Sequence, residues 1–235
     1  MRVAAILTAA GSGTRLGHDL PKALVPLGGV PLVLHAARGL ADSGVVDLVV
    51  VTVPRGSDGA FATAMTQDAG RLGGMTLTLA VGGTSRQASV AAGLAEVPAD
   101  VDLVLVHDAA RPLTPARLVA EVVAAVRAGH RAVIPVVPVT DSVVDVADGD
   151  VRPVDRSTLR GVQTPQGFDR ALLDRAHAAA AHRATDEHSA ATDDASLCAL
   201  LGAVVHAIPG ADDAFKITTP RDLALAEMLL SEVPA

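Results

Sequence analysis

The chain has 235 residues, half of them apolar, and its formal net charge is −7 at pH 7. This length is typical of one large domain with a sizeable core. The sequence has three Phe and neither Trp nor Tyr, so it offers no aromatic platform for single-stranded nucleic acid, and its negative charge disfavours a polyanionic partner. We expect no nucleic acid among its partners, although an acidic chain can still hold a basic site for a small phosphorylated substrate.

No apolar run approaches the ~20 residues that span a bilayer, and the first residues enter an apolar strand without the pattern of a signal peptide. Cys198 is the one cysteine, which excludes a disulfide within the chain and favours the role of a small buried residue. We therefore expect no membrane partner and a cytoplasmic location.

Strand-like apolar runs alternate along the chain with helical ones, and the strands are apolar almost throughout. Such strands are typical of a sheet covered on both faces, so the order predicts an α/β fold with a doubly wound, mostly parallel sheet. The two prolines in 132–139 favour an edge strand or an irregular one. Expected strands cover 3–7, 46–53, 75–81, 103–107, 132–139 and 203–208, and expected helices cover 31–40, 88–94, 115–127, 197–201 and 219–230.

Residues 140–163 depart from this pattern. Two extended stretches, 141–146 and 151–154, flank a turn with Gly149, which predicts a β-hairpin. A lone hairpin has little core of its own, so we expect it to pack against another protein surface, and a second subunit is a candidate. The chain is thus predicted to be a single domain over residues 1–235 with a dimerisation arm at about 140–158.

The first expected strand runs directly into small residues, then to Arg15 and Lys22. Small residues let a phosphate approach the backbone N–H groups, and the two cations add charge, which indicates a nucleoside triphosphate site. Neither a Walker A loop nor a dinucleotide fingerprint fits the spacing. The alternative is a plain strand-to-helix turn. The residues expected to form the loop's nucleotide contacts are Ala9, Ala10, Gly11 and Gly13.

A second glycine turn, Gly82-Gly83, leads into a helix at GGTSRQASV. Helix N-termini present N–H groups to acceptors, and Ser89 could bond a base or ribose. The alternative is that Ser85 simply caps the helix. Because ligands of doubly wound sheets bind beyond the carboxyl ends of the strands, we expect this turn, the first loop and His107-Asp108 to share one rim.

Asp108 follows another strand, in the sequence VHDAARP. A carboxylate there can hold Mg²⁺ together with substrate phosphates, and Arg111 can bind a second phosphate bidentately. The alternative is an Asp–Arg ion pair on the surface. His107 is expected to serve packing or hydrogen bonding. Further along, Asp193-Asp194 is favoured as a helix N-terminus over a metal site.

Taken together, AAGSGTR…PK, GGTSRQASV, VHDAARP, DR, QTPQ, TDDAS and KITTP, in this order, resemble the 2-C-methyl-D-erythritol 4-phosphate cytidylyltransferase family over almost the whole chain. The resemblance implies a Rossmann-like sheet of the nucleotide-diphospho-sugar transferase type, a projecting arm, a homodimer with arm exchange, a divalent metal such as Mg²⁺, and CTP and a polyol phosphate as substrates. The glycine-rich loop alone would fit any nucleotidyltransferase, whereas HDAARP, QTPQ and TDDAS are more specific.

Matching motifs imply the roles of individual residues. Arg15 and Lys22 look like the catalytic cations at the CTP phosphates, and Asp108 looks like the carboxylate that holds the metal beside both substrates. The implied cytidine contacts are Gly83 and Ser89, and the implied contacts to the polyol phosphate are Arg111, Ser142, Arg156, Thr164 and Lys216, with Arg156 reaching in from the partner's arm.

Three positions depart from the family's pattern. Ser142 stands where Thr is usual and keeps the hydroxyl, Ala23 replaces a usual Gln, and Ala214 replaces a usual Asn and loses a polar contact. The predicted reaction is attack of the polyol phosphate on the α-phosphorus of CTP, carried by positioning and electrostatics. The alternatives are a ribitol-5-phosphate cytidylyltransferase and a nucleotide-binding regulator without chemistry.

Overall fold

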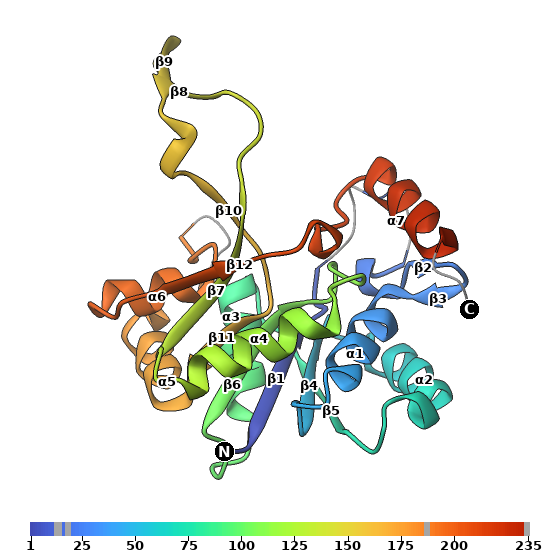
Figure 1. Cartoon of the computed structure of the whole chain (residues 1–235). Helices are drawn as coiled ribbons and strands as arrows, with labels where there is room; N and C mark the ends of the chain where they lie inside the picture. Colours follow the sequence, from blue (N-terminus) through green and yellow to red (C-terminus); the bar gives the residue numbers. More distant parts are fainter. Residues whose placement is uncertain (12–15, 17–19, 186–188, 233–235) are drawn as a thin grey trace.

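Strands and helices alternate along the chain in the computed structural model, which describes residues 1–11, 16, 20–185 and 189–232 (Figure 1). The strands of the central sheet follow the order β10-β7-β11-β6-β1-β4-β5, and β12 also pairs with β7. These strands are β1 Val3–Thr8, β4 Leu48–Val53, β5 Thr76–Val81, β6 Leu103–Asp108, β7 Ala132–Pro138, β10 Arg160–Val162, β11 Gln166–Asp169 and β12 His206–Pro209.

The sheet is mostly parallel, as the sequence predicts. Strands β5, β4, β1 and β6 run parallel to one another, and β12 runs parallel to β7. Strand β11 is antiparallel to both β6 and β7, which makes these two parallel to each other, and β10 is also antiparallel to β7. The carboxyl ends of the parallel strands consequently meet at one edge of the sheet.

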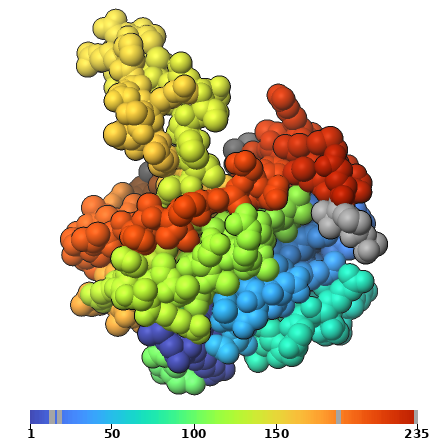
Figure 2. Space-filling model, viewed as in Figure 1, coloured from blue at the N-terminus to red at the C-terminus, as the bar shows by residue number. Residues whose placement is uncertain are grey.

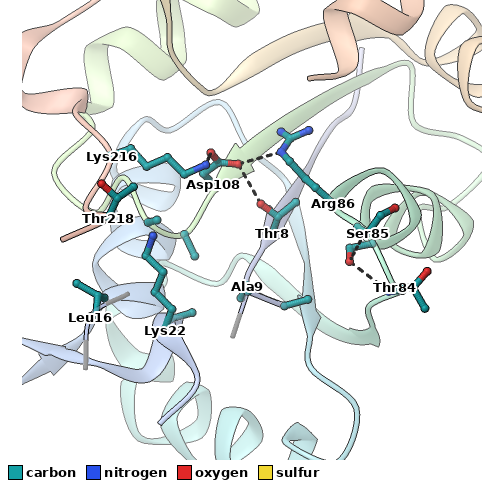
Figure 3. Close-up of a pocket in the computed structure, with 17 residues that line it drawn as sticks. Thr8, Ala9, Leu16, Lys22, Thr84, Ser85, Arg86, Asp108, Lys216 and Thr218 are labelled. Carbon is teal, nitrogen blue, oxygen red and sulfur yellow. Dashed lines mark hydrogen bonds and ion pairs between the residues drawn. The ribbon is translucent and has the colours of Figure 1, made fainter. Parts of the chain in front are cut away.

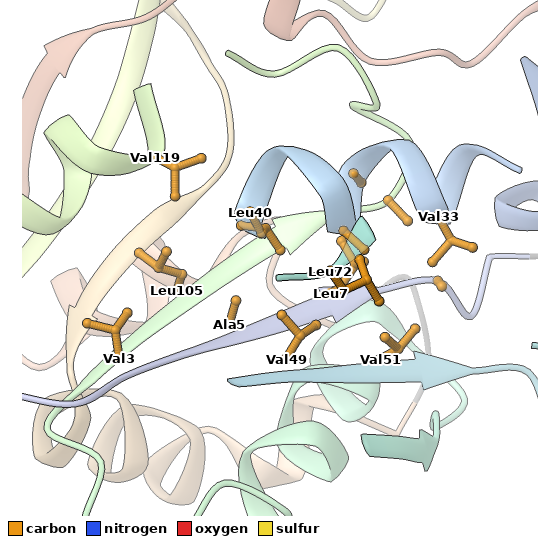
Figure 4. Close-up of a cluster of buried hydrophobic side chains, with 14 of the residues drawn as sticks. Val3, Ala5, Leu7, Val33, Leu40, Val49, Val51, Leu72, Leu105 and Val119 are labelled. Carbon is orange, nitrogen blue, oxygen red and sulfur yellow. The ribbon is translucent and has the colours of Figure 1, made fainter. Parts of the chain in front are cut away.

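Alternating residues of each central strand supply two separate cores. Val3, Ala5 and Leu7 of β1 enter one cluster, and Ala4 and Ile6 enter the other, all of them fully buried (Figure 4). A strand with both faces covered must be apolar at every position, which explains the near-continuous apolar runs in the sequence.

Helices cover both faces of the sheet. Residues of α1, α2 and α4 enter the first cluster, and residues of α3, α5 and α6 enter the second. Helix α7 packs on a small hairpin, β2 Pro26–Leu27 with β3 Val30–Pro31, through a third cluster. Among the described residues, no helix has the length and apolarity to cross a membrane. The helices are α1 Leu32–Asp42, α2 Asp58–Asp68, α3 Arg86–Ala95, α4 Ala116–Arg127, α5 Arg170–Ala179, α6 Asp194–Leu200 and α7 Pro220–Glu232.

The expectation of an edge strand at 132–139 is wrong. Strand β7 bonds to β11 and β10 as well as to β12. Pro135 lacks an N–H, yet its carbonyl accepts from Gln163 N, while the carbonyl of Val136 accepts from Gly210 N. The carbonyls of Pro135 and Val136 thus keep β7 hydrogen-bonded to the chain segments on both of its sides, so the prolines are tolerated inside the sheet.

The predicted hairpin is confirmed as β8 Val143–Ala147 and β9 Asp150–Val154, joined by Asp148 and Gly149. Both turn residues have positive φ, 52° and 86°, as a type I′ turn requires. The hairpin projects away from the sheet (Figures 1 and 2). Val146 is 63% exposed and Val151 is 62% exposed, so the arm presents apolar side chains to solvent within one chain.

Helix α3 approaches the sheet closely at Gly93. A Cβ built there would lie 2.7 Å from Cγ2 of Ile6 and 2.9 Å from Cγ2 of Thr52, both in buried strand positions. Since β-branched side chains have few alternative rotamers, neither neighbour can yield easily. The close approach holds the N-terminus of α3, and with it Arg86, against the carboxyl ends of the strands.

We expect Gly93→Ala to destabilise the fold by about 1–3 kcal/mol because it overpacks this contact. The matched control is Gly59→Ala in α2, where a Cβ meets nothing within 4 Å, so helix propensity should leave it neutral or stabilised. Urea unfolding of the two variants measures the difference. Equal stabilities would show that α3 can move outward without cost.

Candidate active site

A pocket of about 570 Å³ lies at the carboxyl ends of β1, β5 and β6 (Figure 3). Its size suits a small-molecule ligand. The first loop, Gly83 and Asp108 border it together, which confirms the shared rim for these residues, whereas Gly82 and His107 do not line the pocket. Both lysines of the sequence, Lys22 and Lys216, line it as well. A chain with a net charge of −7 thus places its two lysines beside one pocket.

The first loop contributes small residues to the pocket wall. Ala9, Ala10 and Gly11 line it, and Ala9 N donates to the carbonyl of Thr52. Lys22 begins a short 3₁₀ helix, and its backbone N contacts Gly11 O at 3.4 Å. The predicted residues Gly13 and Arg15 lie outside the described part of the chain.

The second glycine turn packs tightly against the start of α3. A Cβ on Gly83 would lie 2.4 Å from Cβ of Ala88, so another side chain would displace the turn. Ser85 caps the helix by accepting from Ala88 N, as the alternative reading expected. Ser89 Oγ accepts from Gly83 N at 3.2 Å and donates to the carbonyl of Ser85 at 2.9 Å, so its hydroxyl holds the turn while it borders the pocket.

Asp108 is buried and surrounded by cations. Its Oδ2 lies 2.7 Å from Lys216 Nζ and 4.0 Å from Arg111 Nε, and its Oδ1 lies 3.4 Å from Arg86 Nε. Thr8 donates to the same Oδ1 at 3.2 Å. The Asp108–Arg111 ion pair that was the alternative exists, but it is poorly exposed rather than on the surface, and it is the longest of the three.

Burial acts to raise the pKa of Asp108, but the charges of Arg86, Lys216 and Arg111 outweigh it and hold that pKa well below its usual range. The carboxylate is therefore ionised at any pH at which the protein functions. Since both its oxygens are already engaged by cations, a ligand that binds here exchanges partners with them.

His107 and Thr164 lie behind Asp108. Thr164 Oγ1 accepts from Asp108 N at 3.0 Å and lies 2.8 Å from His107 Nδ1. Burial lowers the pKa of His107 to about 4, so the ring is neutral near pH 7 and serves the hydrogen bonding that the sequence suggested. Thr164, predicted to contact the polyol phosphate, is 4% exposed and does not line the pocket.

Arg111 is partly buried next to Asp108 and is not among the residues that line the pocket. Its Nη1 donates to the carbonyl of Ala214 at 2.6 Å and its Nη2 to the carbonyl of Val162 at 3.3 Å. Burial lowers the pKa of the guanidinium from its ordinary value, although the pKa of an arginine starts so high that the charge remains. Ala214, where the family usually has Asn, therefore contributes through its main-chain oxygen.

Ser142 and Arg156 are not brought to the pocket within one chain. Both are exposed at the base of the arm. Arg156 borders a separate hollow with Pro138, Val139, Thr140, Ser157 and Arg160. Ser142 and Arg156, the two predicted substrate contacts on the arm, therefore lie apart from the other predicted substrate contacts that the structure describes.

Thr8, Arg86 and Thr218 are among the lining residues to which no motif assigned a role. Thr8 is the last residue of β1 and stands opposite Asp108 in the parallel pairing of β1 with β6. A signal for Arg86 existed, because it opens a helix where a cation opposes the dipole and therefore needs an anionic partner. Its two partners, Asp108 and Asp194, are far away in sequence.

The residues present fit a divalent cation only as a site completed by substrate. Among the described residues that line the pocket, Asp108 is the one carboxylate, and no group of three His, Cys, Asp or Glu residues in the described part of the chain is arranged to hold a metal. Magnesium is commonly held by one or two carboxylates plus substrate phosphates, a pattern that this donor set matches. The Asp193–Asp194 alternative is disfavoured, because Asp193 caps α6 and Asp194 bonds Arg86 and His177.

Comparison with known proteins gives a consistent result. The sequence profile of one family, 2-C-methyl-D-erythritol 4-phosphate cytidylyltransferase, matches residues 3–232. Proteins of that name from Streptomyces coelicolor and Rhodococcus opacus are 48% and 49% identical to this chain, with 98% of it covered in both cases and 85% and 96% of the relatives. The crystal structure of such an enzyme from Thermus thermophilus is 37% identical with a TM-score of 0.79, covering 98% of this chain and all of that one.

These relatives span nearly the whole chain, and the Thermus thermophilus enzyme shares its fold over almost its full length. On this evidence, together with a basic pocket built from the loops that the family's motifs specify, the chain belongs to the 2-C-methyl-D-erythritol 4-phosphate cytidylyltransferase family and is a nucleotidyltransferase.

Proposed function

We propose that the protein transfers the cytidylyl group of CTP to 2-C-methyl-D-erythritol 4-phosphate and releases pyrophosphate, in the non-mevalonate route to isoprenoid precursors. The observation that carries this proposal is the cationic pocket at the carboxyl ends of β1 and β6, where Lys22, Lys216 and Arg86 line the wall together with Asp108, the single acid among the described lining residues. Two polyanionic substrates need such a site. The cytoplasm, which supplies CTP, is the proposed location.

The chemistry requires no general base. A phosphate oxygen of the polyol phosphate, already anionic, forms a bond to the α-phosphorus of CTP, and the bond from that phosphorus to the bridging oxygen breaks to release pyrophosphate. The obstacle is the approach of two anions and the charge that grows in the transition state, so preorganised cations supply the catalysis. Lys22 and Arg15 are assigned to the CTP phosphates, and Lys216 and Arg111 to the polyol phosphate.

Magnesium is the proposed cofactor. When bound with the nucleotide phosphates at Asp108, a divalent cation supplies further neutralisation of phosphate charge. Asp108 is suited to this role by its ionised state and its position on the pocket wall. Lys216 is the most exposed of the three cations that pair with Asp108, at 39%. For a metal to bind Asp108, Lys216 would have to shift toward another anion.

The active assembly is proposed to be a homodimer that exchanges arms. The exposed valines on the hairpin favour a partner, and the exposed Arg156 and Ser142 lack a place in the pocket of their own chain. An arm that packs on a second copy could bring them to its pocket. The partner's Arg156 would then join Arg111 and Lys216 at the same phosphate.

Incubation of the protein with CTP, Mg²⁺ and each candidate acceptor tests the proposed reaction. We expect release of pyrophosphate with 2-C-methyl-D-erythritol 4-phosphate and little with ribitol 5-phosphate. Faster release of pyrophosphate with ribitol 5-phosphate would show that ribitol 5-phosphate is the acceptor. CTP binding without turnover on either acceptor would favour a nucleotide-binding regulator. Family membership favours neither alternative.

We expect Lys22→Ala to lower kcat by about 10²–10³-fold while CTP affinity changes much less, because its charge is needed most as the α-phosphate reacts. Steady-state kinetics and calorimetric CTP titration measure the two quantities. Arg117→Ala, which removes an exposed cation from α4, is the control and should behave as the parent. An unchanged kcat in the Lys22 variant would remove Lys22 from the catalytic role.

Mixing two inactive chains, Arg156→Ala and Lys22→Ala, should restore activity to about a quarter of the parent's at statistical exchange, since each mixed dimer would contain one intact site. Subunits are exchanged in mild denaturant and refolded before the assay. Mixing Lys22→Ala with the double variant Lys22→Ala/Arg156→Ala provides the control, which should stay inactive. Mixed dimers that form and remain inactive would assign Arg156 to its own subunit.

A further inference from the structure

A chain of buried charges leads from the pocket into the protein interior. Arg86 Nε lies 3.4 Å from Asp108 Oδ1, and Arg86 Nη1 donates to Asp194 Oδ2 at 2.7 Å. The other oxygen of Asp194 lies 2.9 Å from His177 Nε2. Asp194 is 1% exposed and does not border the pocket, whereas Arg86 does. The guanidinium of Arg86 therefore connects one pocket carboxylate with one interior carboxylate.

The position of Arg86 in the fold makes this connection necessary. It is the first residue of α3, directly after the cap Ser85, where a positive charge opposes the helix dipole. Its side chain is only 17% exposed, so water solvates the charge poorly. Two carboxylates offset both costs.

The contacts at the two oxygens of Asp108 differ. Oδ1 is approached by Arg86 and the Thr8 hydroxyl, and Arg86 is secured by Asp194. Oδ2 is approached by Lys216, whose side chain is 39% exposed. Arrival of phosphates can draw Lys216 away, but departure of Arg86 would take its positive charge from the buried Asp194 and leave the contact with His177 alone among the described side-chain contacts of Asp194. Burial acts to raise the pKa of Asp194, yet Arg86 and His177 lower it, so Asp194 stays charged.

We infer that Asp194 is a positioning residue for cytidylyl transfer: it fixes the Arg86 guanidinium, which in turn fixes Oδ1 of Asp108 at the pocket wall. The inference rests on the proposed role of Asp108 in that pocket. Arg86 acts directly on the pocket, and Asp194 acts through it from the first turn of α6.

Asp194→Asn tests this inference, because the amide keeps the shape and removes the charge. Loss of such a supporting partner typically costs 10–100-fold, so we expect kcat to fall about 10-fold or more. The matched control is Asp68→Asn, which breaks another poorly exposed Arg–Asp pair, with Arg38 at 2.6 Å, between α1 and α2. Both variants should lose thermal stability, but the control should keep the parent's kcat and CTP affinity.

A second variant separates positioning from folding. Arg86→Met/Asp194→Leu removes both charges together and leaves no unpaired ion, so it should fold. We expect it to remain slow, because Asp108 has lost Arg86. Recovery of the parent's kcat in this double variant would mean that the pair serves only stability and would overturn the inference.

Asp108→Asn completes the set by testing the role on which the inference rests. A slow Asp108 variant beside an Asp194→Asn variant with the parent's kcat and KM overturns the inference alone. An Asp108 variant as fast as the parent overturns both the proposed role of Asp108 and the inference. Slow turnover in Asp108→Asn, in Asp194→Asn and in the double charge variant, with a normal Asp68→Asn, supports the inference.

Discussion

The buried carboxylate of Asp108 needs cations from several directions, and the elements around the pocket are arranged to supply them. The parallel register of β1 and β6 sets Thr8 opposite Asp108. The tight packing of α3 at Gly93 holds Arg86 beside it. Lys216 is placed by its neighbour in sequence, because Ile217 N donates to the carbonyl of Ala110 at 2.8 Å. A carboxylate buried to this degree without such partners would be protonated or would destabilise the fold.

The central strands and the arm could be predicted from sequence because their signals are local. Strands covered on both faces are apolar at successive positions, and the hairpin turn contains Asp148-Gly149, a pair suited to positive φ. Helix α2 escaped notice because only Phe61, Met65 and Asp68 are buried along it, which leaves little amphipathic pattern. The edge position expected for strand β7 was wrong for the opposite reason. Its prolines are a strong local signal for an edge, but pairing with segments distant in sequence overrides that signal.

Motifs identified many of the residues that border the pocket, but they could not identify the hydrogen bonds and ion pairs that hold those residues in place. Ala214 appeared to lose a contact because its side chain is a methyl, yet its carbonyl accepts from Arg111, and a main-chain oxygen leaves no trace in sequence. Arg86 lies inside a motif that drew attention to its glycines and serines. Its partner Asp194 is 108 residues further along the chain. The pairing of two distant charges depends on tertiary packing, which one sequence does not reveal.

A site for two polyanions faces a conflict between the empty and the loaded state. Cations gathered for phosphates repel one another when no phosphate is present, and a poorly solvated cluster would cost stability. Asp108 and Asp194 offset that repulsion through Arg86 and Lys216. The two cations are bound differently, since Arg86 is shared between carboxylates while the more exposed Lys216 touches one of them. Exchange of one ion pair for another can therefore make Lys216 available to an anion in the pocket, while Arg86 remains paired with both carboxylates.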